Sequence, residues 1–207
     1  MDTTQITCAL KNVGVKSCLG VFPSDLSPNF IPQHDCTIIV NADPHTKGGS
    51  HWLAIHFEPR TSKAFYFDSF GQKPYISNIQ DLIRNNSTVQ EYNTVRLQGL
   101  TTTLCGQYCC LFALHMDRGD TPKHFVSTFD PAVADDKVRR LFKFEFGPLH
   151  RIRLRGGQSC TSANMGYHIS SLLLLRRFPF TFYFILTLTF DQYGVCYRGR
   201  IFEVSKW

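Results

Sequence analysis

Two apolar runs separated by a short turn constrain the fold of this chain more than any other feature. Residues 51–57 and 63–70 flank the segment 58–62, which reads Glu-Pro-Arg-Thr-Ser and is rich in turn-forming residues. We therefore expect the two runs to pair as a β-hairpin. The second run is apolar at successive positions, so both faces of its strand are apolar, and we expect a central strand that helices cover on both sides.

Other segments complete the predicted architecture. The β-branched run at residues 36–40 predicts another strand, which the turn-forming sequence Asn-Ala-Asp-Pro ends. Apolar residues recur at helical spacing from residue 76 to 83, from 105 to 116 and from 135 to 146, and each pattern predicts a helix. The predicted fold class is α+β, with a mixed, mostly antiparallel sheet and helices packed on it.

The character of the chain changes after Gly147. A length of 207 residues suits one ordinary hydrophobic core. We expect residues 1–148 to form the domain that carries the chemistry, and residues 149–207, first basic and then rich in aromatic residues, to be a tail outside this fold. The aromatic run at 178–190 contains Pro179 and is shorter than the roughly 20 residues that a membrane-spanning helix needs, so we expect no membrane association.

The charges divide unevenly between these two parts. Residues 1–150 carry 14 Lys and Arg against 14 Asp and Glu, whereas residues 151–207 carry 8 against 2. Clustered basic residues on the folded part usually mark a surface that binds nucleic acid, and here this part is neutral, so its charge does not support DNA binding. The chain does not open with a basic segment followed by an apolar run, and we expect an intracellular protein.

The eight cysteines are expected to be thiols rather than a disulfide framework or a metal site. Intracellular chains of this length usually keep their cysteines reduced. No pair of Cys-x-x-Cys motifs occurs, and Cys105, Cys109 and Cys110 lie on one short segment without histidines at ligand spacing. We therefore predict no metal ion and no cofactor.

Cys105 is the strongest candidate for a nucleophile. It opens the helix predicted from residue 105, where the backbone N–H groups and the helix dipole favour a thiolate. Gly106 follows it, and a residue without a side chain lets a substrate carbonyl approach the backbone N–H. The alternative is that Cys105 is a small buried apolar residue like its neighbours Cys109 and Cys110.

The base for this nucleophile must come from elsewhere in the sequence. His51 begins the predicted hairpin, and with a connection of five residues its antiparallel partner falls near residue 69. Asp68 is therefore close enough to hold the imidazole in one tautomer, and a carboxylate at the end of an apolar strand needs such a partner. A half-exposed strand histidine and a turn-forming aspartate are the alternative interpretations.

Gln98 completes the predicted constellation. Its amide can donate a hydrogen bond to an oxyanion if the Thr-rich turn at 101–103 folds it back beside the cysteine. Alone, a glutamine at this position is a weak signal. The four residues gain weight as a set, because they supply a base, an orienting carboxylate, an oxyanion donor and a nucleophile. In that order they are His51, Asp68, Gln98 and Cys105.

Three segments carry a family resemblance. They are Gly-Gly-Ser-His-Trp-Leu-Ala from residue 48, Tyr-Phe-Asp-Ser-Phe-Gly from residue 66, and Leu-Gln-Gly-Leu-Thr-Thr-Thr-Leu-Cys-Gly-Gln-Tyr-Cys-Cys from residue 97. Together they resemble the adenovirus endopeptidase (adenain) family and its relatives in virus-like mobile elements, over residues 5–146. That family shares its active-site order with the ubiquitin-like-protein (Ulp1-type) cysteine proteases. The resemblance assigns the same four roles to His51, Asp68, Gln98 and Cys105.

The resemblance implies a thiol endopeptidase that matures precursor proteins by cutting after glycine, in aliphatic-x-Gly-x or aliphatic-x-Gly-Gly contexts. It also implies a location in the nucleus or the virion, and stimulation by DNA and by a short viral peptide held by a disulfide. The neutral charge of residues 1–150 does not support the DNA effect, and no cysteine lies between Cys36 and Cys105 to anchor a peptide. Family members often carry Glu where this chain has Asp68. We expect a monomer.

Other functions stay open at this point. The same constellation serves an isopeptidase that acts on ubiquitin or a similar modifier, and an inactive remnant that only binds a partner is a third reading. Residues 154–157, Leu-Arg-Gly-Gly, match the cleavage pattern and raise the hypothesis of self-cleavage after Gly157. A Gly-Gly pair is also common in linkers, which is the simpler interpretation of this segment.

Overall fold

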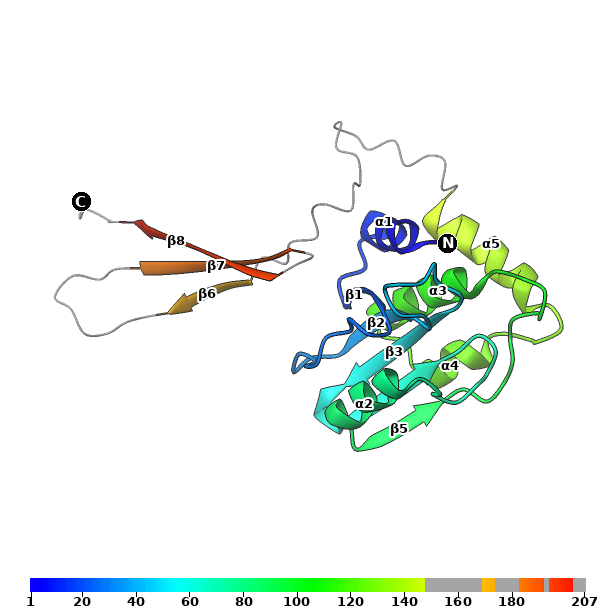
Figure 1. The fold of residues 1–207 in the computed structure, drawn as a ribbon. Coiled ribbons are helices and arrows are strands. Elements are labelled where there is room, and N and C mark those ends of the chain that lie inside the picture. Colours follow the sequence, from blue (N-terminus) through cyan, green and yellow to red (C-terminus); the bar gives the residue numbers. More distant parts are fainter. Residues whose placement is uncertain (148–168, 174–182, 192–193, 203–207) are drawn as a thin grey trace. The chain divides into compact units, whose positions relative to one another are not determined.

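A five-stranded mixed sheet forms the framework of the first of two compact units, Met1–Arg153 (Figure 1). The computed structural model describes residues 1–147, 169–173, 183–191 and 194–202. In spatial order the strands are β1 (Cys18–Pro23), β2 (Cys36–Asn41), β3 (Trp52–Glu58), β4 (Lys63–Phe67) and β5 (Val89–Tyr92). The β1–β2 and β4–β5 pairs are parallel, whereas β2, β3 and β4 are antiparallel, so the sheet is mixed.

The β3–β4 hairpin forms where the sequence predicts it. A 3-10 turn at Pro59–Thr61 joins the two strands, and Ser62 ends this turn in the left-handed conformation, with a φ of 53°. Ala54 lies opposite Phe67. This register differs by one residue from the register expected for a five-residue connection, because β3 continues as far as Glu58 and the connection is shorter.

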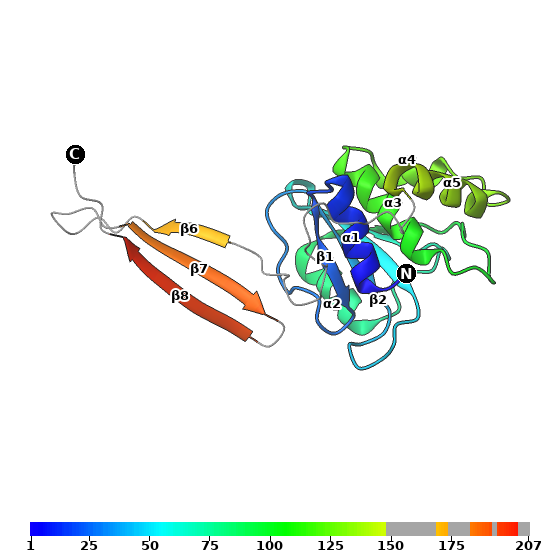
Figure 2. The same cartoon turned by 90° about the horizontal axis from the view of Figure 1, so that it is seen from above.

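Helices cover both faces of the sheet, which confirms the predicted α+β class. Within the described residues the helices of this unit are α1 (Thr3–Val13), α2 (Ser77–Asn86), α3 (Cys105–Asp117), α4 (Pro122–Ser127) and α5 (Ala134–Phe146). α1, α3 and α5 pack against one another on one side of the sheet, as Figures 1 and 2 show from two directions. α2 packs on the other side.

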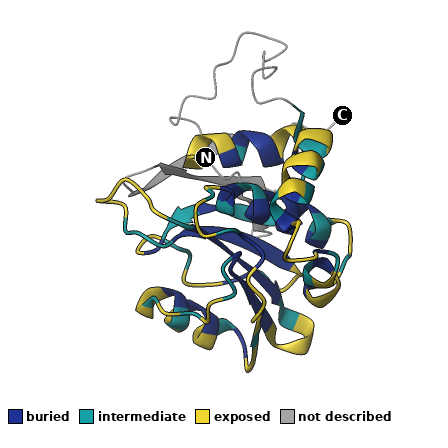
Figure 3. Cartoon of the chain, turned by 90° about the vertical axis from the view of Figure 1, so that its right-hand side faces the viewer, coloured by how far each residue is buried: buried dark blue, intermediate teal, exposed yellow. Residues whose placement is uncertain are grey.

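The alternating residues of β4 point into two separate cores. Phe65 and Phe67 lie in the core that contains α3 and α5, where the Phe67 ring stacks on Phe112 with centroids 4.9 Å apart. Ala64 and Tyr66 lie in the second core, against α2. Figure 3 shows the buried residues along the strands and the inner faces of the helices. Most residues of α3 are buried, so the helix that begins at the candidate nucleophile is held firmly by the core.

Four elements of this unit lie outside the sequence prediction: α1, β1, β5 and α4. α1 begins with a capping box in which Asp2 and Gln5 satisfy each other's backbone N–H groups. β1 contains Gly20 and an irregular register with its neighbour, and β5 is short and largely exposed. Pairing with a partner strand forms these two strands, and their own patterns of apolar residues do not predict them.

Three strands belong to the second unit, Leu154–Trp207. They are β6 (Ile169–Leu173), β7 (Tyr183–Asp191) and β8 (Gly194–Phe202), which form an antiparallel sheet in that order. The division of the chain at residue 148 stays a prediction, and the Leu-Arg-Gly-Gly motif at 154–157 lies outside the described residues. Among the residues that the structure describes, no helix is long and apolar enough to cross a membrane.

Candidate active site

His51 and Asp68 meet at one end of the β3–β4 hairpin. His51 immediately precedes β3 and Asp68 immediately follows β4. Nε2 of the imidazole lies 2.7 Å from Oδ1 of the carboxylate, which is fully buried, and the histidine side chain is 11% exposed. The Phe70 ring stacks on the imidazole with centroids 4.9 Å apart, and the Phe70 N–H donates to the same Oδ1 at 2.8 Å. The histidine ring is therefore fixed by a carboxylate at its Nε2 atom and by an aromatic ring on one face.

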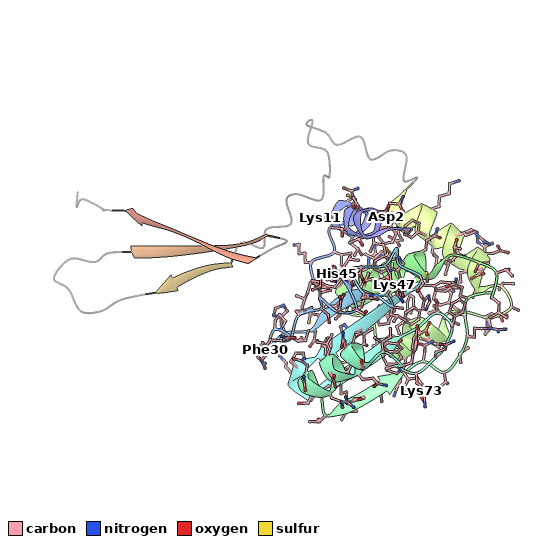
Figure 4. All side chains as sticks on the ribbon, viewed as in Figure 1. Asp2, Lys11, Phe30, His45, Lys47 and Lys73 are labelled. Atoms are coloured by element: carbon pink, nitrogen blue, oxygen red, sulfur yellow. The ribbon has the colours of Figure 1, made fainter. Side chains whose placement is uncertain are left out.

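Hydrogen bonds to Asp25 hold the loop that leads to His51. The carboxylate of Asp25, just after β1, accepts from the backbone N–H of His45 at 2.8 Å and lies 2.6 Å from its Nδ1 atom. His45 lies on the exposed loop before β3 and is labelled in Figure 4. Gly49 has a φ of 82°, and a Cβ atom there would lie 2.7 Å from the Asn41 side chain, so the close approach of this loop to β2 requires glycine. The backbone of His51 thus starts β3 from a fixed position.

Asn93 holds the backbone of Asp68, and the sequence gives little sign of this role. Its side-chain Oδ1 accepts from the Asp68 N–H at 2.9 Å, and its Nδ2 donates to the Asp68 carbonyl at 2.7 Å. The asparagine is 4% exposed. It follows β5, which pairs with β4, so the amide bridges the ends of two neighbouring strands. An asparagine directly after a strand reads as an ordinary turn residue, and only the parallel β4–β5 pairing gives it this position.

Cys105 is the first residue of α3, as predicted, and it faces the imidazole. Burial alone raises the pKa of its thiol, but the hydrogen bond to His51, the backbone N–H groups of Trp52 and Gly106 and the histidine charge bring it below its ordinary value. Burial alone lowers the pKa of His51, but hydrogen bonds and charges from Asp68 and the cysteine sulfur raise it to about 9. Both shifts favour a thiolate beside an imidazolium near neutral pH.

Four other thiols of the domain differ from Cys105. Burial raises the pKa of Cys18 to about 11 and that of Cys36 to about 12. Cys109 and Cys110 lie on α3 and are buried in the core, and burial raises the pKa of each well above its ordinary value. These thiols stay protonated at neutral pH, whereas the environment of Cys105 favours the charged form.

Gly106 is closely surrounded where a side chain would begin. A Cβ atom on this residue would lie 3.1 Å from Cβ of Met1 and 3.4 Å from both Ile6 and Trp52. The Trp52 indole donates to the Met1 carbonyl at 2.8 Å. The start of α1 and the tryptophan therefore occupy the space that a side chain would need, and close packing between helices accounts for the glycine. These contacts surround the position of a Cβ atom, and the expectation that a substrate carbonyl approaches the backbone N–H stays a prediction.

Gln98 lies in the turn between β5 and α3, folded back toward the hairpin. Its backbone N–H donates to the Ser69 carbonyl at 2.9 Å, which ties it to the residue after Asp68. Its side chain is almost fully buried, accepts from the Ser69 hydroxyl and donates from Nε2 to the Thr102 carbonyl at 2.6 Å. A primary amide carries two N–H donors, and this bond uses one of them. The second N–H donor of the amide is not used by this bond.

The structure thus brings three of the predicted residues into direct contact and holds the fourth beside them. His51 contacts both Asp68 and Cys105, and Gln98 is bonded to the strand end that carries Asp68. Within the described ranges, no group of three or more His, Cys, Asp or Glu side chains is arranged to hold a metal ion. The arrangement can generate a nucleophilic thiolate and deliver a proton from the same histidine.

Sequence comparisons match the chain to viral proteases. The family model for the adenovirus endoprotease matches residues 18–123. The protease of Porcine adenovirus A serotype 3 is 30% identical over 150 residues, which cover 64% of this chain and 72% of that protein. The protease of Snake adenovirus serotype 1 is 32% identical over 113 residues, covering 42% and 56% of the two chains. The protease of Human adenovirus B serotype 3 is 29% identical over 107 residues, which cover 45% of this chain and 51% of that protein. The chain therefore spans about half the length of the snake and human adenovirus proteases.

Solved structures of related proteases are also similar, at low TM-scores. A crystal structure of an ASFV protease is 19% identical, with a TM-score of 0.49, and the match covers 70% of this chain and 66% of that one. The Ulp1 protease domain in complex with SMT3, the yeast ortholog of SUMO, is 12% identical, with a TM-score of 0.44 and coverage of 72% and 76%. The sequence matches alone identify the family. The chain belongs to the adenovirus endoprotease family.

Proposed function

We propose that this chain is a cysteine endopeptidase, with Cys105 as nucleophile and His51 as general base and acid. Asp68 orients and charges the histidine, and Gln98 stabilises the oxyanion. The observation that carries this proposal is the position of the imidazole, which contacts the Asp68 carboxylate through Nε2 and is also hydrogen-bonded to the Cys105 side chain. A histidine held between a buried carboxylate and a thiol with a lowered pKa is the arrangement that nucleophilic catalysis needs.

The reaction follows from these contacts. The Cys105 thiolate attacks the carbonyl carbon of the scissile bond, and the carbonyl oxygen becomes an oxyanion. The free N–H of the Gln98 amide and the first backbone N–H groups of α3, which have no acceptor within the helix, donate to it. The C–N bond then breaks, and the leaving amine takes the proton from His51. An acyl-enzyme remains, and a water molecule that gives a proton to the neutral histidine attacks it and releases the acid.

Membership of a protease family implies protein substrates. We propose further that the chain cuts after glycine, in aliphatic-x-Gly-x or aliphatic-x-Gly-Gly contexts, and so matures precursor proteins. The resemblance of the three active-site segments to the adenain family supports this preference. Stimulation by DNA is not part of the proposal, because residues 1–150 carry equal numbers of basic and acidic side chains.

The test is hydrolysis of a fluorogenic Leu-Arg-Gly-Gly peptide by the wild type and by Cys105→Ala, with the cut located by mass spectrometry. Cys105→Ala should lose all measurable hydrolysis and keep its fold, because alanine fits the same space. Cys110→Ala is the matched control, since this thiol is buried on the same helix and stays protonated. If Cys105→Ala retained about a tenth of the wild-type rate, the nucleophile would be another group.

An isopeptidase for ubiquitin-like modifiers is the second candidate. The Ulp1 domain named above is described in complex with such a modifier, SMT3. Comparing kcat/KM for a modifier conjugate with kcat/KM for the short peptide separates the two functions. An endopeptidase of precursors should show no large preference for the folded modifier. An inactive remnant would cleave neither substrate, and the contacts among His51, Asp68 and Cys105 speak against it.

The remaining expectations form part of the same proposal. Residues 1–148 would act as the catalytic domain, with 149–207 outside it, in a monomer located in the nucleus or the virion. Weighing the full chain as wild type and as Cys105→Ala tests self-cleavage after Gly157. A wild type that stays at full length while it cleaves the added peptide would remove this hypothesis.

A further inference from the structure

Both ends of the Gln98 carboxamide are held. Oε1 accepts from the Ser69 hydroxyl at 2.7 Å, and Nε2 donates to the Thr102 carbonyl at 2.6 Å. A carboxamide can be turned end for end, and only its NH2 end can donate to an oxyanion. The Thr102 carbonyl is purely an acceptor, so the NH2 end must face it, and the hydroxyl can then donate to the other end. The position of Thr102 therefore decides which way the amide faces.

The turn that carries Thr102 is held from a distant helix. Oδ2 of Asp135, in the first turn of α5, accepts from the Gly99 N–H at 3.2 Å and from the Thr102 hydroxyl at 2.9 Å. Oδ1 accepts from the Tyr108 hydroxyl at 2.9 Å. Tyr108 lies one turn along α3 from Cys105. One carboxylate thus joins the turn of the candidate oxyanion donor to the helix of the candidate nucleophile.

The surroundings fit this carboxylate closely. A Cβ atom on Gly99 would lie 3.0 Å from Oδ2 of Asp135, so the glycine permits the approach. Burial and the hydrogen bond to Asp135 raise the pKa of Tyr108, which therefore remains a donor at neutral pH. The next residue, Asp136, differs: its side chain is 70% exposed and pairs with Arg139 at 3.1 Å on the same helix. Adjacent aspartates therefore occupy different environments, and only the first reaches the turn.

We propose that Asp135 is a positioning residue for the oxyanion donor. It holds the turn 98–102 so that the second N–H of the Gln98 amide is directed toward the oxygen of a carbonyl that Cys105 attacks. Asp135 touches neither the sulfur nor the substrate, and it acts through Gln98. This inference rests on the proposed function, in which Gln98 donates to the oxyanion.

The test is a double-mutant cycle in the full chain. Asp135→Asn keeps the size of the side chain but removes its charge and replaces one acceptor oxygen with a donor. At least one of the three hydrogen bonds to Asp135 must then weaken, reverse its direction or be lost. We expect kcat for the Leu-Arg-Gly-Gly peptide to fall by about 10- to 100-fold with little change in KM, because a small misplacement of an oxyanion donor acts on the transition state. In a Gln98→Ala background the same substitution should change kcat by less than about twofold. The matched control Asp136→Asn should leave kcat within about twofold in both backgrounds.

The rate at which iodoacetamide alkylates Cys105 distinguishes a displaced oxyanion donor from general damage to the active site. This reaction needs the thiolate but forms no oxyanion, so Asp135→Asn should alkylate at the wild-type rate while its peptide hydrolysis falls. An Asp135→Asn variant with wild-type kcat, or with the same loss of kcat in the Gln98→Ala background, would overturn the proposal. A parallel loss of alkylation would also overturn it, because it would show damage to the cysteine and histidine themselves.

A second variant covers the case in which Asp135→Asn does not fold. Thr102→Val removes the hydroxyl that donates to Asp135 and keeps the shape of the side chain, so it should reproduce the loss of kcat without changing alkylation. A wild-type kcat for this variant would count against the proposal. Failure of the proposed function has another signature, since hydrolysis would then survive in Cys105→Ala. The two failures are therefore distinguishable.

Discussion

The substitution Asp68→Asn tests how much the buried carboxylate contributes to the charge of His51. Asparagine has almost the same shape, and its Oδ1 can still accept from the His51 Nε2–H and from the Phe70 N–H, which lie 2.7 and 2.8 Å from this atom in the wild type. The negative charge is lost. Among the described residues the other oxygen, Oδ2, is buried without a hydrogen-bond partner. The new NH2 group would be buried there without an acceptor, so we also expect a loss of stability of about 1–3 kcal/mol.

The pKa of His51 sets the expected effect on catalysis. It rises from 6.5 to about 9 in the wild type, with Asp68 and Cys105 as the sources of the rise. A shift of this size corresponds to about 3 kcal/mol in favour of the imidazolium. Asp68 and Cys105 both contribute to this stabilisation. Removing the carboxylate charge should lower the pKa of His51 by about one unit or more and raise that of Cys105, because the imidazolium that stabilises the thiolate is less populated.

The assay is kcat/KM for the Leu-Arg-Gly-Gly peptide from about pH 5 to about pH 10. In the wild type the rate should rise as Cys105 loses its proton and fall near pH 9 as His51 loses its own. In Asp68→Asn the alkaline limb should move to lower pH, and the maximum should fall by about 10²–10⁴-fold. An alkaline limb that stays near pH 9, with a maximum within about threefold of the wild type, would refute the assignment of Asp68 to His51.

Three further predictions concern stability. Gly71→Ala should lower the free energy of unfolding in urea by about 1–3 kcal/mol, because the φ of Gly71 is 71° and a Cβ atom would lie 2.7 Å from a backbone carbon of the facing segment. Gly119→Ala, where φ is 83° and the space is open, should lower it by less. Equal losses for the two variants would contradict the steric reasoning. Burial lowers the pKa of His56 below its ordinary 6.5, so the free energy of unfolding should fall as the pH drops below 6.5. His56→Leu should flatten this pH dependence. An unchanged slope in the variant would show that other groups cause the pH dependence. Asn93→Ala removes the amide that hydrogen-bonds both backbone groups of Asp68. We expect it to lower the free energy of unfolding by about 1–3 kcal/mol and also to lower kcat/KM. An unchanged kcat/KM would show that this amide does not support the active site.

Local patterns were sufficient to predict the hairpin and the helix of the nucleophile. The alternating apolar residues of β4 require cover on both faces, and the two cores supply it. His51 and Asp68 are near one another because a short turn connects their strands, so counting residues along the hairpin already brings them together. The count was wrong by one residue because the 3-10 turn at Pro59–Thr61 shortens the connection.

Long-range contacts could not be predicted in the same way. Asn93 reaches Asp68 only because β5 pairs in parallel with β4, and Asp135 reaches the turn of Gln98 only because α5 packs beside α3. Each is a polar residue whose local sequence suggests a turn or an exposed helix start. The contact between α1 and Gly106 likewise depends on the packing of helices that are far apart in the sequence. The preference for cleavage after glycine rests on the resemblance of the active-site segments, and it remains a prediction.

The most direct test of the central claim compares two thiols on different elements of the domain. Cys105 and Cys18 are both partly buried, but the pKa of Cys105 is lowered and that of Cys18 is raised to about 11. Limited alkylation with iodoacetamide at neutral pH, followed by peptide mapping, gives the rate at each residue. The thiolate and imidazolium pair predicts that Cys105 reacts much faster than Cys18 and that His51→Ala abolishes this difference. Equal rates in the wild type, or a fast Cys105 that does not depend on His51, would contradict it.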